Sequence, residues 1–200
     1  FSENPVPYFE SLMEQYPSGY LDVPIVGAGT VNTEFEVMTG MNLDDFGPGE
    51  YPFKTILKET TCESIAYNLK EYGYATHAIH DNTATFYSRN VVFSNLGYDT
   101  FSSIETMNID DFTPMGWAKD YFLTDEIVAL DSTEGQDYIY TISVQGHGSY
   151  PTEGDYDYPI TVSGLDDQAK TNQYQYYVWQ INEMDKFIQK LVETLSKRDE

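Results

Sequence analysis

Short apolar runs that suit β-strands alternate along this chain with segments of helical periodicity. The strand-like runs are rich in tyrosine, threonine and aliphatic residues, and they occupy residues 74–79, 98–101 and 138–144. Parallel strands need a long crossover connection, which is usually a helix. The alternation therefore favours an α/β sandwich with a largely parallel sheet.

Helical spacing of apolar residues predicts the connecting elements. Helices are expected over 5–16, 59–72 and 116–132, and a long helix runs from about 172 towards the C-terminus. The side chains expected to face inward are Tyr8, Phe9, Leu12, Met13, Tyr16, Ile65, Leu69, Tyr72, Trp117, Tyr121, Phe122, Ile127, Ile181, Met184, Ile188, Leu191 and Leu195.

The stretch "GYLDVPIVGAG" predicts a strand that ends at Val26 and runs into a glycine turn before Thr30. Thr33 and Glu36 have the spacing of a capping box, and Gly40 follows at the position of a helix C-cap. A short helix is therefore predicted over 33–39.

The totals fit one domain that spans residues 1–200, because 40% of the residues are hydrophobic and no repeat or linker divides the chain. Lys and Arg number 10 against 33 Asp and Glu, so the formal net charge is −23. Such a surface repels phosphate backbones and anionic lipid, which excludes nucleic acid as an expected partner. A small phosphorylated substrate stays compatible where local cations outweigh the global field.

The single cysteine, Cys62, rules out an internal disulfide, which fits a cytoplasmic protein and equally an exported one. No apolar run approaches the roughly 18 residues of a membrane span, and no signal peptide opens the chain. Because Phe1 stands where a Met would begin a protein, we expect a segment of something longer, with a membrane anchor upstream left open.

Chemically useful residues follow three of the predicted strands. Thr30 follows the first, His80 and Asp81 follow the second, and His147 follows the last. Ligands of open α/β sheets bind beyond the carboxyl ends of the strands, so these positions are site candidates. His77 lies inside a strand and is expected to be a core or face residue.

Each candidate also has a structural interpretation. A threonine between glycine and a helix is usually a cap, and a histidine in a strand-terminal turn is usually a surface residue. Arg89 is either a surface charge or an anion clamp, since a guanidinium suits phosphate. The acidic loop 149–170 is expected to be solvated, and the 18 tyrosines indicate packing before they indicate glycan contacts.

Three stretches, "GTVNTEFEVMTG", "HAIHDNTATFYSRNVVFSNLGYD" and "YTISVQGHGSYP", resemble in order and spacing the lipoteichoic acid synthase-like phosphoglycerol transferases of the sulfatase and alkaline phosphatase superfamily. The resemblance implies a three-layer α/β/α sandwich of the alkaline phosphatase type. It implies that Thr30 is the nucleophile and a ligand of a divalent metal, typically Mn²⁺. It also implies a substrate pocket of His80, Tyr87, Arg89 and His147, with Tyr87 where relatives often have Trp.

The resemblance also indicates what these 200 residues lack. The family's metal site needs an acidic ligand on an earlier strand and an Asp-His pair on a later one, and this sequence holds no Asp-His dipeptide. We therefore expect a partial catalytic domain, incomplete at both ends, with metal binding weak or absent and the isolated chain inactive.

The implied reaction moves glycerol phosphate from a phosphatidylglycerol-like lipid to a hydroxyl of a glycerol phosphate polymer or glycan, through a covalent intermediate on Thr30. The implied setting is the extracytoplasmic face of the membrane and the cell wall, with anchoring by upstream transmembrane helices.

Two other functions remain open from the sequence. One is a phosphodiesterase or sulfatase-like hydrolase, although a sulfatase would need a C/S-x-P-S-R-type motif and Thr30 is followed by Val-Asn-Thr-Glu. A phosphoethanolamine transferase would usually carry several disulfides. The other is a non-catalytic module that binds glycerophosphate or wall glycan, which would not need Thr30.

Overall fold

The computed structural model describes residues 1–25, 27–131 and 134–198. The chain packs as two compact units. The first, the helical unit, contains Phe1–Gly19, Ile109–Val128 and Ser143–Glu200, and the second, the sheet unit, contains Tyr20–Asn108 and Ala129–Ile142. That all 200 residues form one domain stays a prediction.

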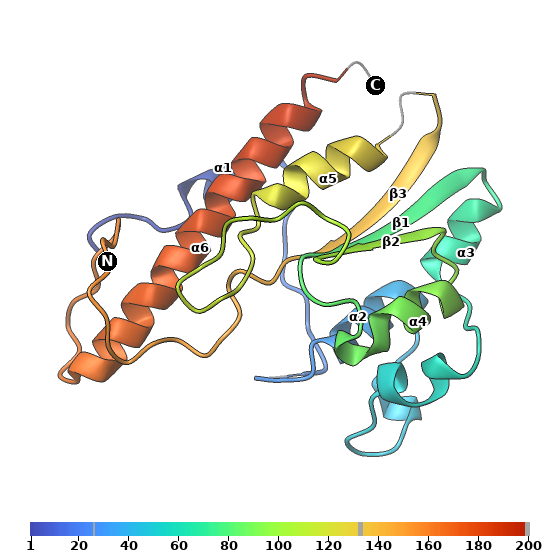
Figure 1. Ribbon diagram of the computed structural model, residues 1–200, viewed down its shortest axis with the longest axis horizontal. Coiled ribbons are helices and arrows are strands. Elements are labelled where there is room, and N and C mark those ends of the chain that lie inside the picture. The colour runs from blue at the N-terminus through green and yellow to red at the C-terminus, as the bar shows by residue number, and fades with distance from the viewer. Residues whose placement is uncertain (26, 132–133, 199–200) are drawn as a thin grey trace. The chain divides into compact units, whose positions relative to one another are not determined.

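Helices and strands alternate along the described residues (Figure 1). The helices are α1 (Pro7–Gln15), α2 (Val31–Thr39), α3 (Ile65–Lys70), α4 (Arg89–Asn95), α5 (Phe122–Leu130) and α6 (Gln168–Leu195), and the strands are β1 (Tyr74–His80), β2 (Thr100–Ser103) and β3 (Gln136–Ile142). Short 3₁₀ turns occupy Leu43–Asp45, Pro52–Lys54, Ile56–Lys58 and Phe86–Ser88.

The three strands form a parallel sheet in the order β2-β1-β3. His80, the last residue of β1, pairs with Ser103 on β2 and with Ile142 on β3, so the three strands end at the same edge. The prediction of an α/β fold with a parallel sheet is confirmed. β2 and β3 each begin two residues away from the predicted strand, whereas β1 lies where it was expected.

Helices α2, α3 and α4 cover the face of the sheet that carries Ala78 (Figure 1). They enclose one hydrophobic core of fully or almost fully buried side chains: Val31, Phe35, Met38, Phe53, Leu57, Ala66, Ala78, Val92, Phe93, Leu96 and Tyr98. This core fixes α2, which follows Thr30, and α4, which begins at Arg89.

Within the helical unit, α1 packs along α6, and a side chain of α6 caps it. The Asp185 carboxylate accepts hydrogen bonds from the backbone N–H groups of Tyr8 and Phe9, at 3.1 and 2.7 Å. Val6 precedes α1 and has no side-chain acceptor, so Asp185 satisfies donors that the helix start leaves open. No residue of α1 is fully buried, although its apolar face was expected to turn inward.

The strand predicted before Thr30 was wrong over the described residues 20–25, which form no strand. Pro24 lacks a backbone N–H and no neighbouring strand pairs with this run. Val26, where that strand was to end, lies outside the described residues.

The predicted capping box at Thr33 was also wrong. The helix begins at Val31, and the Glu36 carboxylate instead accepts a hydrogen bond from the Leu43 N–H at 2.8 Å.

Other helix boundaries differ for local reasons. The Ser64 hydroxyl accepts from the Ala66 N–H and so starts α3 six residues later than predicted, which leaves Ile65 and Tyr72 exposed. The predicted helix over 116–132 begins only at Phe122, so Trp117 and Tyr121 precede it; residue 132 lies outside the described residues. Helix α6 begins four residues earlier than predicted, behind an Asp167 cap.

Candidate active site

Thr30 occupies the N-cap position of α2, and its side chain makes no capping hydrogen bond. The residue is exposed, while its neighbour Gly29 is buried. Gly29 has a φ of +84°, and a Cβ there would lie 2.7 Å from Cε1 of Tyr51. A glycine is therefore required for the turn that presents Thr30, on grounds of both backbone conformation and space.

Arg89 is held by a buried ion pair with Glu34. Its Nε and Nη2 donate to the two carboxylate oxygens of Glu34 at 3.1 and 2.5 Å, and Nη1 donates to the Phe86 carbonyl at 3.3 Å. Both side chains are buried, Arg89 almost completely. The pair joins α2, which begins after Thr30, to α4, which begins at Arg89 itself.

Tyr87 lies in the tight turn that leads into α4. Tyr87 and Ser88 both adopt left-handed backbone conformations, with φ values of 56° and 57°. The Tyr87 ring stacks on Tyr51 at a centroid separation of 6.4 Å, and the Arg89 guanidinium lies 5.4 Å from the Tyr87 centroid. Thr30, Tyr87 and Arg89 are thus linked through two intermediaries, Tyr51 and Glu34.

The sequence did not single out these two intermediaries. Glu34 stands three residues after Val31 and four before Met38, so it shares the buried face of α2. A lone acidic residue on such a face is a signal for a buried partner. Nothing in the sequence near Tyr51 indicates that it packs against Gly29.

His80 ends β1 and is buried. Its Nδ1 lies 3.0 Å from the carbonyl of Ile142 on β3. A carbonyl only accepts, so Nδ1 carries a proton in this contact. The Asp81 carboxylate lies 3.7 Å from the same nitrogen. His77, three strand positions earlier and on the opposite face to Ala78, contacts the Thr100 hydroxyl and the Asp137 carboxylate, as a structural residue on a strand would.

Burial and charge shift two phenols next to the ion pair. Burial raises the pKa of the Tyr140 phenol on β3, and the negative charge of Glu34 raises it further. Burial also raises the pKa of Tyr98, with Tyr138 and Tyr140 adding to the shift. Both phenols stay neutral in the ordinary pH range, so they add no anion that would repel a phosphate.

His147 belongs to the helical unit, on the loop after β3, and is exposed. Its Nδ1 contacts the Gly148 carbonyl at 2.5 Å, and its ring lies 4.6 Å from the Trp117 ring. The other candidates, Thr30, His80, Tyr87 and Arg89, all belong to the sheet unit.

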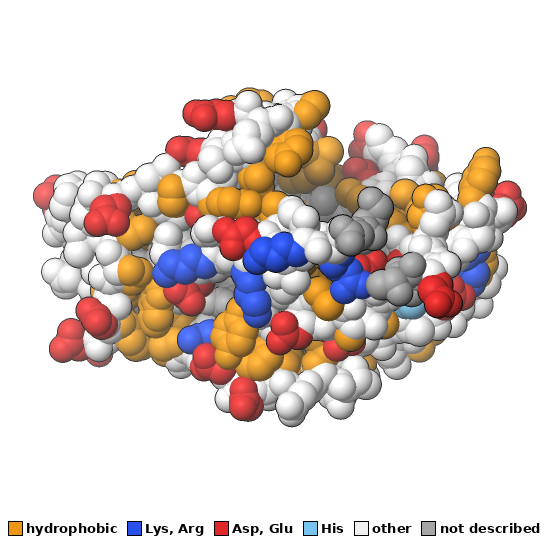
Figure 2. Space-filling model, turned by 90° about the horizontal axis from the view of Figure 1, so that it is seen from above, with side chains coloured by type: hydrophobic (Ala, Val, Ile, Leu, Met, Phe, Trp, Pro, Cys, Tyr) orange, Lys and Arg blue, Asp and Glu red, His pale blue; other side chains and the backbone are white. Residues whose placement is uncertain are grey.

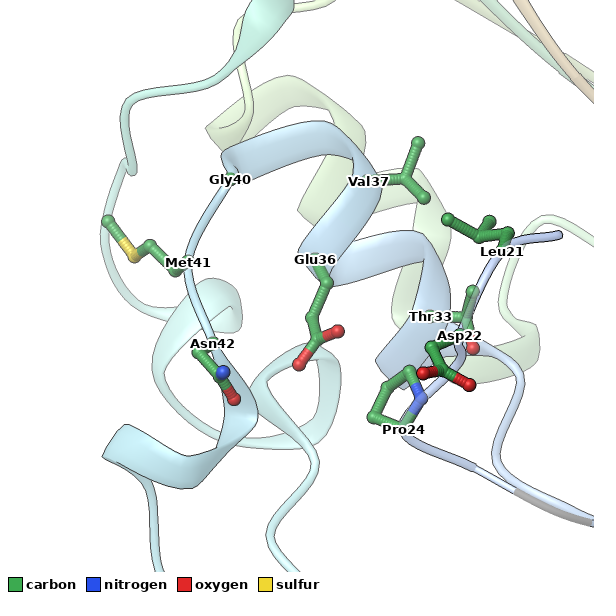
Figure 3. Close-up of a pocket in the computed structure, with 9 residues that line it drawn as sticks. All are labelled: Leu21, Asp22, Pro24, Thr33, Glu36, Val37, Gly40, Met41 and Asn42. Atoms are coloured by element: carbon green, nitrogen blue, oxygen red, sulfur yellow. The ribbon is translucent and has the colours of Figure 1, made fainter. Parts of the chain in front are cut away.

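Two surface pockets flank α2 without including the candidate side chains. One, of about 330 Å³, lies between residues 21–24 and 40–42, with Thr33, Glu36 and Val37 on its helix side (Figure 3). The other, of about 430 Å³, is lined by Asn32, Tyr51 and the loop 43–50, together with Pro24 and Ile25. Neither is lined by Thr30, His80, Tyr87 or Arg89.

A complete metal centre is not formed by the part of the chain that the structure describes. Within it, no group of three or more His, Cys, Asp or Glu side chains is arranged to hold a metal ion. Thr30 alone of the expected ligands is present, so these residues do not fit a metal by themselves.

Over the described ranges, no helix is long and apolar enough to cross a membrane.

On the face shown in Figure 2, acidic and basic side chains are interspersed with hydrophobic ones, and no continuous basic surface is visible there. The expectation that nucleic acid is not a partner stays a prediction.

Known proteins resemble the chain over almost its whole length. A putative cyclic beta-1,2-glucan modification protein of Rhizobium meliloti is 27% identical over 197 residues, which are 98% of this chain and 30% of that protein. The chain thus spans less than a third of this relative.

Solved structures share the fold. The phosphoglycerol transferase GacH of Streptococcus pyogenes, in complex with sn-glycerol-1-phosphate, matches with a TM-score of 0.80 and 20% identity over 98% of this chain and 52% of its own. The lipoteichoic acid synthase LtaP of Listeria monocytogenes matches with a TM-score of 0.79 and 19% identity over 96% of this chain and 46% of its own. The expected alkaline phosphatase-like fold is confirmed.

A more distant match is the C-terminal periplasmic domain of EcEptC from Escherichia coli, in complex with Zn, with a TM-score of 0.59 and 19% identity over 96% of this chain and 52% of its own. That neighbour is a periplasmic domain and holds Zn. The sulfatase family itself matches residues 3–200, so the chain belongs to the sulfatase family.

Proposed function

We propose that this chain is part of a phosphoglycerol transferase in which Thr30 is the nucleophile. The observation that carries the proposal is the Thr30 hydroxyl, which is exposed at the start of α2 and is not used to cap the helix. The N-terminus of a helix favours an anion, because its backbone N–H groups and dipole point towards it. A phosphate that approaches Thr30 would meet this end of α2.

The proposed reaction has two displacements at phosphorus. Thr30 Oγ1 attacks the phosphate of a phosphatidylglycerol-like donor, the bond to the diacylglycerol oxygen breaks, and the threonine proton ends on the leaving diacylglycerol. An acceptor hydroxyl of a glycerol phosphate polymer or glycan then attacks the phosphoglycerol on Thr30. The new ester forms, the Thr30 bond breaks, and the acceptor's proton returns to the threonine.

The residues proposed to bind the headgroup are His80, Tyr87 and Arg89 of the sheet unit and His147 of the helical unit. His80 would contact a glycerol hydroxyl from the end of β1, while its Nδ1 donates to the Ile142 carbonyl. Arg89 holds Glu34 and the Phe86 carbonyl, so it would reach a phosphate oxygen only through its remaining N–H groups. Its main effect would be to fix the Tyr87 turn against α2.

The relatives support this choice over other reactions of the superfamily. Of the two solved chains with the highest similarity scores reported above, one is a phosphoglycerol transferase that holds sn-glycerol-1-phosphate, and the other is a lipoteichoic acid synthase. The curated relative is named for glucan modification, which is compatible with a glycan acceptor.

We also propose that the whole protein binds a divalent cation such as Mn²⁺ with Thr30 as one ligand, and that other ligands come from parts of the protein beyond these 200 residues. The proposed place of action is the extracytoplasmic face of the membrane, with anchoring outside this chain.

The test is a set of threonine variants in the full-length protein. Thr30→Ala should abolish release of diacylglycerol from phosphatidylglycerol, and Thr30→Ser should keep part of it, because only the second retains a hydroxyl. Thr33→Ala is the matched control, since Thr33 lies one helical turn further along α2. Mass spectrometry of the wild type should find a phosphoglycerol adduct on the peptide that contains Thr30.

Unchanged turnover in Thr30→Ala would refute the nucleophile assignment. A wild type that binds glycerol phosphate without any turnover would favour a binding module. Turnover that depends on Thr30 but releases free glycerol phosphate, with none on an added acceptor, would instead favour a phosphodiesterase of the same superfamily.

A further inference from the structure

A lysine lies over two stacked tyrosine rings, one of which packs against Gly29. Lys54 Nζ is 4.4 Å from the Tyr51 ring centroid and 4.9 Å from the Tyr87 centroid. The two rings are nearly parallel, with an interplanar angle of 13°. We call Tyr51, Lys54 and Tyr87 the lysine–tyrosine platform.

The platform is tied to the turn that presents Thr30. The space that a Cβ would need at Gly29 is taken by Cε1 and the hydroxyl of Tyr51, at 2.7 and 2.8 Å. Tyr51 therefore touches the residue directly before the proposed nucleophile. Tyr87, on the other side, is a proposed pocket residue. The lysine thus lies over one ring that packs on Gly29, the residue before Thr30, and over a second ring that stacks on the first.

Lys54 carries a positive charge that is not compensated by an ion pair in the described parts of the chain, whereas the charge of Arg89 is. The chain has 10 basic residues against 33 acidic ones, so positive charge at an anion site must come from nearby groups. Arg89 is buried and its charge is compensated by the two oxygens of Glu34. Lys54, by contrast, is exposed, and within the described parts of the chain its ammonium forms no ion pair.

An ammonium over tyrosine rings is held in place by cation–π attraction while its N–H donors remain available. Such a group suits a phosphate as a point charge.

We propose that Lys54 is a substrate-binding residue that contacts the phosphate of a glycerol phosphate group at Thr30, with Tyr51 and Tyr87 as its support. This rests on the proposed function, because it names a further residue of the same site. The shared chemistry is a glycerol phosphate, whether it is a lipid headgroup or a free glycerol phosphate.

The test compares three variants of the full-length protein. Lys54→Met removes the charge and keeps the length of the stem, Lys54→Arg restores a cation, and Lys58→Met is the control. Lys58 ends the next 3₁₀ turn and is also exposed, but has no ring beneath it in the described structure. Each variant is measured for turnover of phosphatidylglycerol in vesicles, for calorimetric binding of sn-glycerol 1-phosphate, and for its melting temperature.

Lys54→Met should raise KM and weaken sn-glycerol 1-phosphate binding by about tenfold, the size of one charge-assisted hydrogen bond, with kcat changed less than about twofold. Lys54→Arg should recover most of both losses, and Lys58→Met should change neither. The binding of sn-glycerol 1-phosphate to the wild type should weaken with added salt more steeply than its binding to Lys54→Met.

Equal KM and equal binding in Lys54→Met and Lys58→Met would overturn the inference, and so would a lower melting temperature as the sole effect of Lys54→Met. The wild type could bind glycerol phosphate but transfer none, while Lys54→Met loses that binding. This result would support the binding role of Lys54 and refute the transferase activity. A wild type that does not bind glycerol phosphate would refute both.

Discussion

Removal of the Glu34 charge should destabilise the sheet unit more than any surface substitution. In Glu34→Gln the amide oxygen can accept one guanidinium N–H, but the amide N–H₂ faces the other as a second donor. The Arg89 charge then stays buried without compensation, since only 1% of its surface is exposed. Breaking a buried pair on one side costs about 3–5 kcal/mol, against a total stability of about 5–15 kcal/mol for a typical domain.

Urea denaturation followed by circular dichroism measures this loss. The matched control is Glu183→Gln, which breaks the exposed i,i+3 pair with Lys186 and should cost less than about 1 kcal/mol. The double variant Glu34→Leu with Arg89→Met removes both charges together. Its loss of stability should fall well below the sum of the losses in Glu34→Leu alone and Arg89→Met alone.

A loss of less than about 1 kcal/mol in Glu34→Gln, or strict additivity in the double variant, would refute the view that this pair joins α2 to α4. If the destabilisation is found but transfer activity per folded molecule is unchanged, the pair supports the fold without positioning Thr30.

Three further outcomes are expected. Gly29→Ala should destabilise by at least about 1–2 kcal/mol, because it combines a left-handed backbone with a clash against Tyr51; full stability in thermal melting would contradict this. Asp185→Ala should cost about 1–2 kcal/mol in urea by leaving two N–H groups of α1 without acceptors, and Asp185→Asn should cost less; equal costs would argue against the capping role. Burial raises the folded-state pKa of Tyr98 and Tyr140 above the unfolded value of about 10, so their stabilisation is complete below that pH and declines as pH rises above it. Tyrosinate absorbance should therefore appear together with unfolding in an alkaline titration, and ionisation well before unfolding would refute the assignment.

Local patterns predicted the elements whose boundaries depend on local chemistry. β1 was predicted almost to the residue, because its run of tyrosine, threonine and aliphatic residues is bounded by glycine at one end and by Asp-Asn at the other. Gly40 was predicted as a helix C-cap and adopts a left-handed φ of 69°. In both cases the determining residues lie within a few positions of the boundary.

Long-range partners account for most of what the sequence could not predict. Glu34 and Arg89 are 55 residues apart in the sequence. Asp185 caps α1 through the N–H groups of Phe9 and Tyr8, which lie 176 and 177 residues before it. The capping box was predicted because Thr33 and Glu36 have suitable spacing. In the structure, however, the Glu36 carboxylate accepts a hydrogen bond from the Leu43 N–H in the turn that follows α2. A capping box therefore does not form where the carboxylate accepts a hydrogen bond from another N–H group nearby.

The start of α2 shows why the Thr30 hydroxyl is not used to cap the helix. A threonine that precedes a helix ordinarily turns its hydroxyl back onto an N–H of the first turn, in an extended backbone conformation. Thr30 instead has helical φ and ψ values of −50° and −30°, and its hydroxyl makes no such bond. The buried Gly29 and the Tyr51 ring hold the preceding turn, while the Glu34 pair fixes the helix that follows. The helix therefore starts without the help of its threonine, and the hydroxyl at its positive end stays available for a substrate.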